Sequence, residues 1–307
     1  MGFSAAKLLL LVINGEARVN EVHVGSRRRD PRAPDVELAS AFKPYPGVQG
    51  DRDEIPYIPA SSWVGVLRHL LEKYYNLPAQ TPRKSRQTNI IAPIHECKTL
   101  DEILKCPVCK IFARRDVVAW FDDMEPLGSS YKVQSSRSAG EYLIRNERGQ
   151  LVAHVFVKDE IVVPRDIERI VVMPDQVGLS GNRPLSGEDL VKQGFRLEPI
   201  PRQVQVVSGV FKFAAKFDMT KLSFDDIKPF FIGLTLLEDR YVGMRGSRGY
   251  GRIEIDNLNF EIRDSGYYEE GRAPVKLNVN FKKPREILAN WEAIKRAFED
   301  AVRKLAK

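Results

Sequence analysis

The sequence predicts an α+β fold with a ferredoxin-like core of the order β-α-β-β-α-β, interrupted by insertions and followed by an added helix. Strand-like apolar runs and two amphipathic helical patterns occur along the chain in that order. The 307 residues are 43% hydrophobic and 29% charged, which is typical of globular proteins, and they show no repeat of solenoid period. We therefore interpret residues 1–307 as a single domain with insertions.

The first predicted element is a strand over residues 7–24, in one piece or two, because it opens with the apolar run from Lys7 to Ile13. That run is too short to span a membrane and no cleavage site follows it, so we expect a cytoplasmic protein without membrane contact. Residues 26–57 hold five prolines and many charges. They predict a long, basic, irregular loop, which in a compact protein is usually functional or disordered.

A helix is predicted over residues 62–76, with Ser61 or Ser62 as its N-cap. Its apolar residues recur at helical spacing, namely Trp63, Val66, Leu67, Leu70, Leu71 and Tyr74. The free amides and the dipole at its start could hold a phosphate. The alternative is an ordinary capped core helix, and the helical pattern by itself favours that alternative.

All three cysteines lie close together, in residues 90–113. His95-x-Cys97 is followed by Cys106-Pro-Val-Cys109, which supplies four ligands for a closed, tetrahedral, structural zinc site. With four protein ligands, no position is left for catalysis at the metal. The alternatives are a redox-active Cys-x-x-Cys or three buried thiols. Three cysteines in so short a stretch do not form a secreted disulfide framework.

Residues 114–203 form the least regular part and predict a thumb-like insertion, in the form of a projecting hairpin. Leu151 to Val163 alternates like a strand, and Val204 to Phe217 is a second, stronger strand pattern. The next helix is predicted to begin at Ser223 or Asp225 and to continue to Leu237, with Pro229 tolerated near its start.

A loop rich in glycine and arginine follows this helix, in residues 241–252. Its glycines are Gly243, Gly246, Gly249 and Gly251, and its arginines are Arg245, Arg248 and Arg252. Glycine permits a close backbone approach and arginine matches phosphate oxygens, so the loop is suited to a polyanion. It is not a dinucleotide fingerprint, because it follows a helix and opens a strand. The alternative is a glycine-rich surface hairpin.

The strand after the loop contains Ile253 and Ile255 and continues toward Phe260 and Ile262. Pro284 opens a final amphipathic helix over residues 284–307. Its apolar side consists of Ile287, Trp291, Ile294, Phe298, Val302 and Leu305.

The 48 Lys and Arg residues exceed the 41 Asp and Glu residues, which gives a formal net charge of +7. The excess gathers at residues 26–29, 83–86 and 114–115 and in the glycine-rich loop. Each cluster alone is best explained as a solvated face. Four clusters in predicted loops together favour a nucleic-acid partner.

Three segments, in this order, resemble the RAMP superfamily of CRISPR proteins. Residues 58–68, IPASSWVGVLR, are similar to its Ile-Pro-Gly-Ser-Ser-x-x-Gly-x-x-Arg segment. Residues 106–112, CPVCKIF, are similar to the Cys-Pro-x-Cys-x-x-Phe segment of its type III members, and residues 246–252, GSRGYGR, to its glycine-rich loop. Their order and spacing are those of the backbone subunit of the Csm and Cmr effector complexes.

The resemblance implies an RRM-like palm, a β-hairpin thumb and a zinc-bearing insertion. It also implies partners: CRISPR RNA, target RNA, other subunits of a type III complex and further copies of this chain. The basic clusters, the helix start and the glycine-rich loop, taken together with this resemblance, predict RNA binding by Ser61, Ser62, Arg68, Arg245, Gly246, Ser247, Arg248, Gly249, Arg252, Arg27, Arg28 and Arg29.

Cleaving members of the family use an aspartate in the loop after the first strand, together with a divalent cation such as magnesium. Asp35 is the first candidate here and Asp30 the second, whereas Asp51 and Asp53 are better explained as surface turn residues. His23 could contact RNA or act as a base, but a lone histidine on a strand is more often structural.

The sequence departs from the family pattern at three places. Ala60 replaces the usual glycine, Val64 stands where lysine is common, and the loop over 26–57 is longer and does not align. The alternative functions are therefore a non-cleaving scaffold subunit, a CRISPR-RNA processing endoribonuclease and a zinc-containing RNA-binding protein outside CRISPR. The serine pair and the cysteines argue against the processing nuclease, and the three motifs in order argue against the last.

Overall fold

The structure is a computed structural model. It describes residues 8–22, 36–37, 41–44, 54–79, 81–84, 91–112, 118–126, 132–136, 141–145, 151–162, 168–170, 197–199, 202–242 and 251–305. Side chains are described for residues 8–22, 57–79, 95–112, 118–126, 208–242 and 251–305.

A nine-stranded sheet organises the chain. Its strands are β1 (Leu9–Val22), β2 (Val36–Glu37), β7 (Ala119–Phe121), β8 (Lys132–Ser136), β9 (Glu141–Arg145), β10 (Leu151–Val162), β13 (Arg202–Asp218), β14 (Arg252–Asp264) and β15 (Val275–Lys276). They lie in the order β15-β14-β1-β13-β10-β9-β8, and β2 and β7 also pair with β13. Every pairing is antiparallel except that of β2 with β13. The mixed helix and antiparallel-sheet class predicted from the sequence is confirmed.

Strand β1 is one continuous element, flanked by β13 and β14. Its apolar run is buried almost without interruption, because a strand with a neighbour on each side has no free edge and here one face packs into the core. Toward its end the pairing shifts register between Val19 and Val22, and Glu21 has a positive φ of 50°. β1 therefore ends in a bulge, which commonly re-aims the chain that follows.

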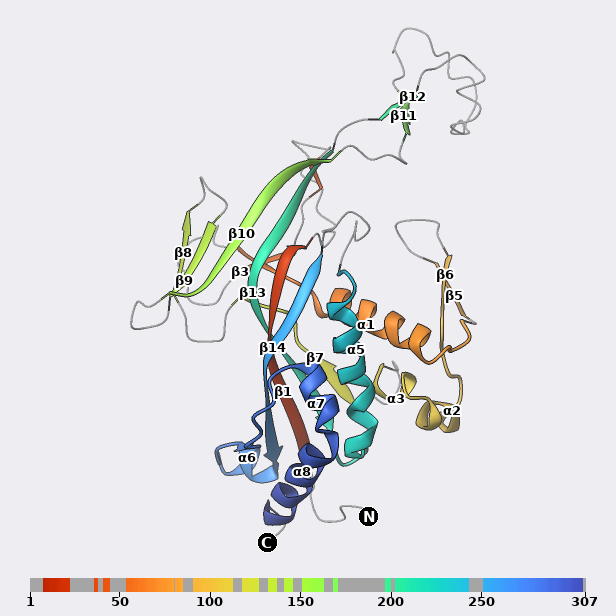
Figure 1. The fold of residues 1–307 in the computed structure, drawn as a ribbon, viewed down its shortest axis with the longest axis vertical. Coiled ribbons are helices and arrows are strands. Elements are labelled where there is room, and N and C mark those ends of the chain that lie inside the picture. The colour runs from red at the N-terminus through yellow and green to blue at the C-terminus, as the bar shows by residue number, and fades with distance from the viewer. Residues whose placement is uncertain are drawn as a thin grey trace.

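The main helices lie on one side of the sheet (Figure 1). They are α1 (Ala60–Tyr74), the 3-10 turn η1 (Phe224–Ile227), α5 (Lys228–Glu238), α7 (Pro284–Ala289) and α8 (Trp291–Leu305), and the shorter α6 (Ser265–Glu269) follows β14. The core between the layers is aromatic, with Trp63, Phe217, Phe230, Phe231 and Phe260 fully buried. Helices α1 and α5 approach closely at Gly233, where an added Cβ would lie 2.7 Å from the Leu67 side chain.

The C-terminal segment is two helices rather than the single predicted one. Asn290 ends α7, where its backbone N–H donates to the carbonyl oxygens of Glu286 and Ile287. The predicted apolar side is otherwise correct, since Trp291, Ile294 and Phe298 are buried in the core.

The predicted irregular loop over 26–57 contains short strands, which the prolines did not lead us to expect. Beside β2, the strands β3 (Ala41–Pro44) and β4 (Glu54–Tyr57) form an antiparallel pair. Proline is tolerated there because these strands are short and pair only with each other. Further pairs form between β5 (Thr81–Lys84) and β6 (Ile91–Ile94), and between β11 (Glu168–Ile170) and β12 (Leu197–Pro199).

Strand β13 has 17 residues and joins two ladders end to end. Its second half pairs with β1, and its first half pairs with β10, with Val207 opposite both Val22 and Val157. Strands β10 and β13 run together away from the helical layer, and β11 and β12 lie beyond their far end (Figure 1). No helix in the described part of the chain is long and apolar enough to cross a membrane.

Candidate functional site

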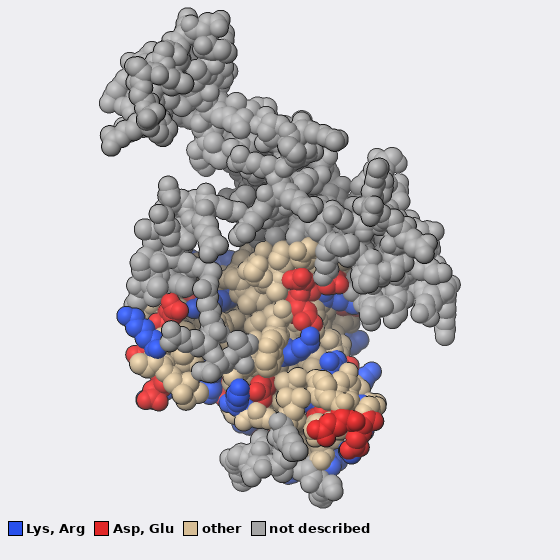
Figure 2. Space-filling view, turned by 180° about the vertical axis from the view of Figure 1, so that it is seen from behind, with Lys and Arg blue, Asp and Glu red and all other residues tan. Residues whose placement is uncertain are grey.

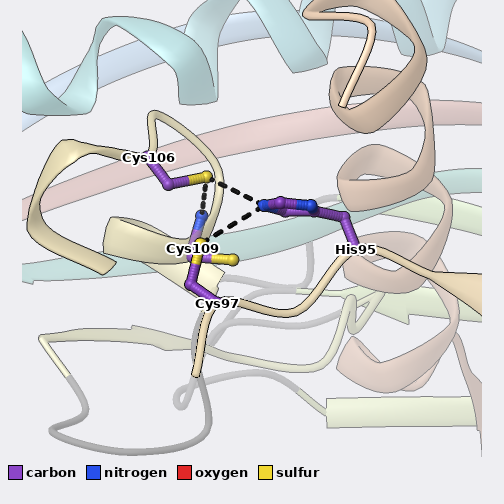
Figure 3. A group of neighbouring side chains, drawn as sticks. All are labelled: His95, Cys97, Cys106 and Cys109. Carbon is purple, nitrogen blue, oxygen red and sulfur yellow. Dashed lines mark hydrogen bonds between the residues drawn. The ribbon is translucent and has the colours of Figure 1, made fainter. Parts of the chain in front are cut away.

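The four predicted zinc ligands converge on one point. His95 follows β6, and Cys97 lies two residues later. Cys109 is the first residue of α3 (Cys109–Phe112), and Cys106 lies three residues before it. Between the two halves lies α2 (Leu100–Lys105), whose capping box joins Thr99 and Glu102 and fixes its direction. The candidate ligand atoms all lie within 4.8 Å of one another (Figure 3).

The distances fit a tetrahedral zinc ion. His95 Nε2 lies 3.3 Å from Cys97 Sγ and 3.4 Å from Cys106 Sγ. Zinc bonds of about 2.3 Å to sulfur and about 2.0 Å to nitrogen place such ligand atoms roughly 3.5 Å apart in a tetrahedron. Three sulfurs and one imidazole nitrogen are also the donor set that zinc prefers. The residues present therefore suit a structural zinc ion.

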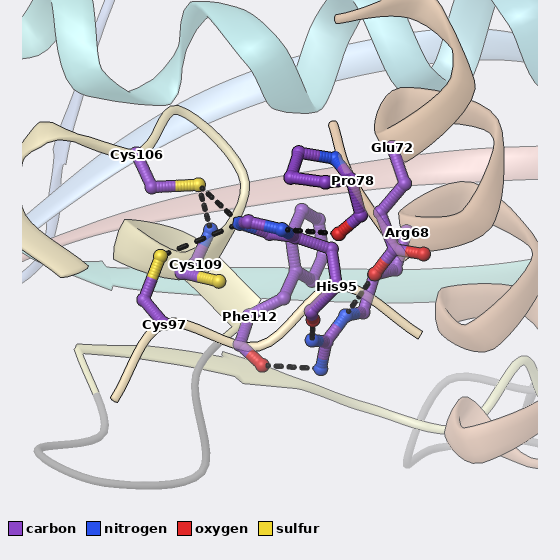
Figure 4. Close-up of polar contacts among 8 residues, drawn as sticks. All are labelled: Arg68, Glu72, Pro78, His95, Cys97, Cys106, Cys109 and Phe112. Atoms are coloured by element: carbon purple, nitrogen blue, oxygen red, sulfur yellow. Dashed lines mark hydrogen bonds and ion pairs between the residues drawn. The ribbon is translucent and has the colours of Figure 1, made fainter. Parts of the chain in front are cut away.

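The orientation of the His95 ring is fixed by a hydrogen bond on its far side. Its Nδ1 lies 3.0 Å from the carbonyl oxygen of Pro78, just after α1. A carbonyl only accepts, so Nδ1 carries the proton and Nε2 presents its lone pair to the cysteines (Figure 4). Such a partner beyond the ligand is typical of metal-binding histidines.

The thiols are electrostatically unequal. A hydrogen bond from the Cys109 thiol, helped by the backbone N–H groups of Cys109 and Val108, lowers the pKa of Cys106 to about 4. The same bond, together with burial, raises the pKa of Cys109, and burial raises that of Cys97. Cys106 is therefore the cysteine that ionises most readily, and the thiolate is the form that binds a metal ion.

Burial argues against the redox alternative. Cys106 and Cys109 are only 7% and 2% exposed. A thiol–disulfide exchange partner must reach one of the sulfurs, and reactive cysteines are accordingly at least partly exposed. The Cys-x-x-Cys pair is therefore poorly placed for disulfide exchange, although Cys97 is partly exposed.

The predicted serine cap of α1 is wrong. The N-cap is Pro59, and no side chain caps through Ser61 or Ser62, which lie inside the first turn. The backbone N–H of Ala60 instead donates to the Asp123 carboxylate at 2.8 Å. This carboxylate already occupies the positive end of the helix dipole, where a phosphate would bind, so the start of α1 is less suited to a phosphate than predicted.

Arg68, which is predicted to bind RNA, instead makes its described hydrogen bonds within the protein. Its guanidinium is engaged with Glu72, His95 and Phe112, and its side chain is only 18% exposed. All three partners belong to the protein itself, so these bonds hold the guanidinium inside the protein, and the RNA contact of this residue stays a prediction.

The base of the glycine-rich loop is pinned to the end of β1. The Val242 N–H donates to the Gly251 carbonyl at 2.9 Å, and the Gly251 N–H donates to the Glu21 carbonyl at 3.1 Å. The Glu21 N–H donates in turn to Ser208 Oγ at 2.8 Å. The glycine-rich loop and the loop after β1 therefore leave the sheet at one junction, which the sequence did not reveal.

Most other predicted site residues lie outside the described residues. This holds for Arg27, Arg28, Arg29, Asp30, Asp35, His23, Asp51, Asp53, Arg245, Gly246, Ser247, Arg248 and Gly249. Arg252, at the start of β14, is described and exposed. The described part of the face opposite the view of Figure 1 carries both signs of charge (Figure 2).

A pocket of about 600 Å³ was not anticipated. Asn14 and Glu16 of β1, Asn257 and Asn259 of β14, the three acids Asp122, Asp123 and Glu125, and Lys212 line most of it. Carboxylates outnumber lysine there, so the pocket is not suited to a polyanion.

Comparison with known proteins gives a consistent family. A family model described as the RAMP superfamily matches residues 18–254. The CRISPR system Cms endoribonuclease Csm3 of Methanocaldococcus jannaschii is 43% identical over 67 residues, 21% of this chain and 27% of that protein. The protein of the same name from Methanothermobacter thermautotrophicus is 26% identical over 240 residues, 76% of this chain and 80% of that protein.

Two solved structures also resemble the chain. One is a Csm3–Csm4 subcomplex of the type III-A CRISPR-Cas interference complex, with a TM-score of 0.42 and 18% identity over 93% of this chain and 96% of that one. The other is a type III-B Cmr-β complex bound to cognate target RNA, with a TM-score of 0.36 and 15% identity over 82% of this chain and 60% of that one. Because the family model covers more than two thirds of its length, the chain belongs to the RAMP superfamily.

Proposed function

We propose that this chain is a guide-RNA-binding backbone subunit of a type III CRISPR interference complex. The observation that carries the proposal is the similarity to a relative named Csm3 over 80% of that relative's length. The proposed partners are CRISPR RNA, target RNA, other subunits of the complex and further copies of this chain, in the cytoplasm. Guide pairing would read the sequence, so the protein needs only contacts to backbone and shape.

The palm of this subunit would be ferredoxin-like. Units β1-α1-β7 and β13-α5-β14 supply its strands, and the order β14-β1-β13-β7 interleaves the two units. The paired strands β10 and β13 would form the thumb; β10 lies within the insertion over residues 114–203, and β13 begins at the end of that insertion. Residues 90–113 would be the metal-binding insertion, 26–57 a basic RNA-facing segment and 284–307 the C-terminal addition.

The guide RNA would lie against the junction where two loops leave the sheet. The arginines of residues 243–250 and of 27–29 fall in those loops, whereas the hydrogen bonds of Gly251 and Glu21 fix the points at which the loops join the sheet. Phosphate contacts there would bind any sequence alike. In the metal-binding insertion, zinc held by His95, Cys97, Cys106 and Cys109 would act as a structural cross-link.

The bound RNA tests this function directly. The chain purified from its native cells is expected to carry short RNAs that share a repeat-derived end. Arg245→Ala combined with Arg248→Ala should weaken RNA binding equally for all sequences and reduce its salt dependence, because phosphate contacts release counterions. Heterogeneous RNA without a common end would contradict the guide-binding role. Sequence-selective loss in the variant would mean base contacts instead of phosphate contacts.

Target cleavage is a second candidate, and the name endoribonuclease of both curated relatives favours it. Asp35, or otherwise Asp30, would hold a divalent cation such as magnesium through carboxylate oxygens, and the ion would stabilise charge on the scissile phosphate. Asp35→Asn should abolish metal-dependent cutting of target RNA by the assembled complex and leave guide and target binding intact.

The same change at Asp30 is the matched comparison, since both acids fall in the stretch of sequence between β1 and β2. If both single variants and the double variant cut like the wild type, neither acid is catalytic. A wild-type complex that binds target without cutting it would establish the scaffold role. Cutting of the CRISPR RNA precursor by the isolated chain would instead establish the processing nuclease.

A further inference from the structure

Arg68 connects helix α1 to both halves of the Cys/His cluster. Its Nε donates to Glu72 Oε1 at 2.9 Å, one turn along the same helix. One terminal nitrogen donates to the carbonyl oxygen of His95 at 2.6 Å, and the other to that of Phe112 at 3.2 Å. A single guanidinium therefore bonds to three acceptors on three segments of the chain (Figure 4).

The two carbonyls stand at the two ends of the cluster. His95 is the first candidate ligand, and Phe112 ends α3, which begins at the last candidate ligand, Cys109. Helix α2, which lies between the halves, has no buried residue and gives the segment little packing of its own. The distance between the His95 half and the Cys106–Cys109 half therefore depends on their contacts with the rest of the protein, and Arg68 bonds to both halves.

The environment of Arg68 suits this role. Glu72 is only 7% exposed, and its carboxylate compensates the charge of the guanidinium. A planar guanidinium donates in several fixed directions at once, whereas a lysine ammonium has no such fork. His95 is held a second time by α1 and its continuation, through the bond between its ring Nδ1 and the Pro78 carbonyl.

We infer that Arg68 is a positioning residue of the metal centre, which sets the separation of the His95 half from the Cys106 and Cys109 half. The inference rests on the proposed zinc centre and goes beyond it. It assigns this residue a role in the protein interior, apart from the RNA contact predicted for it. Contacts of this kind, one step beyond the ligands, typically change metal affinity by about 10- to 100-fold.

The test compares three full-length variants with the wild type by competition for zinc against a chromophoric chelator. Arg68→Met removes the fork but keeps an unbranched apolar stem, and should weaken zinc binding by about 10- to 100-fold. Arg68→Lys keeps the charge opposite Glu72 and should recover only part of the affinity. The absorption bands of the cobalt-loaded Arg68→Met chain should also shift, because the ligand geometry changes.

Lys110→Met is the matched control. The Lys110 side chain ties the same module to the helical layer through Asp226 at 2.7 Å, with side-chain exposures of 20% and 22%. Its only bond to a candidate ligand in the described residues is through the backbone, where its N–H donates to the Cys106 carbonyl at 3.1 Å, and methionine keeps that bond. It should therefore keep the wild-type zinc affinity and cobalt spectrum. If Lys110→Met and Arg68→Met lose equal zinc affinity, the effect arises from weaker attachment of the whole module to the helical layer, and the inference is overturned.

Two further outcomes separate this inference from the proposal beneath it. If the wild-type chain itself binds no zinc, the metal centre is refuted. If the wild type binds zinc and Arg68→Lys or Arg68→Met binds it equally well, only the role of Arg68 is refuted. Arg68→Lys keeps its ion pair with Glu72, so it provides this answer even where Arg68→Met does not fold.

Discussion

Serine at both Cys106 and Cys109 is expected to reduce the zinc content from about one ion per chain to none and to unfold residues 91–112 locally. A serine hydroxyl does not replace a thiolate as a zinc ligand, and His95 and Cys97 alone leave half the tetrahedron empty. Because binding of a structural metal is itself folding free energy, the loss should cost about 4–5 kcal/mol or more.

Elemental analysis of freshly purified protein measures the zinc, and amide hydrogen exchange measures the local unfolding. Val108→Ala is the control: it shortens a fully buried side chain between the two cysteines and leaves all four ligand side chains and the Val108 N–H in place. It should lower stability while zinc stays near one ion per chain. Full zinc in the double serine variant would refute the ligand assignment.

Gly251→Ala is expected to distort the base of the glycine-rich loop and to weaken RNA binding. Gly251 has a φ of +83°, and an added Cβ would lie 2.3 Å from the Val242 carbonyl oxygen, which is backbone and cannot turn aside. Relief requires Val242 to move, and its hydrogen bond to Gly251 then breaks. Left-handed strain and the clash together should cost more than about 2 kcal/mol.

Two other glycines separate these causes. Gly271 also has a positive φ, of +69°, but an added Cβ there meets nothing within 4 Å. Gly271→Ala should therefore cost only about 1–2 kcal/mol of strain and leave RNA binding intact. Gly65, in α1, has neither problem, so alanine there should stabilise the chain by about 0.5–1 kcal/mol. Wild-type RNA affinity in Gly251→Ala would show that the loop base does not set the RNA site.

The sequence predicted that four candidate metal ligands converge, because their signal is local. The four side chains lie within fifteen residues of one another in the sequence, namely His95, Cys97, Cys106 and Cys109. A Cys-x-x-Cys with a nearby His-x-Cys is a spacing typical of a metal site. The strand and helix patterns of β1, β13, α5 and β14 were likewise visible in the sequence, because the apolar residues of each element recur at strand or helix spacing.

The failures share the opposite property: each depends on a distant partner. The cap of α1 is the Asp123 carboxylate, 63 residues beyond Ala60, and a nearby serine gave a stronger local signal. Arg68 meets two backbone carbonyls, which any sequence possesses, so no residue type announced its role. The junction at Glu21 and Gly251 also consists of backbone bonds. Strand β7 has three residues, too few to show a period.

The shared strand β13 has a consequence for how far the chain can reach. Its first half belongs to the projecting pair with β10 and its second half to the core, so both are one uninterrupted backbone. Two extra residues in each of β10 and β13 would lengthen the arm by about 7 Å and leave every side chain on its face. One extra residue would turn the whole outer arm over. The arm can thus change length in steps of two residues per strand while the core stays unaltered. Its length therefore sets how far from the core its tip lies, independently of the core itself.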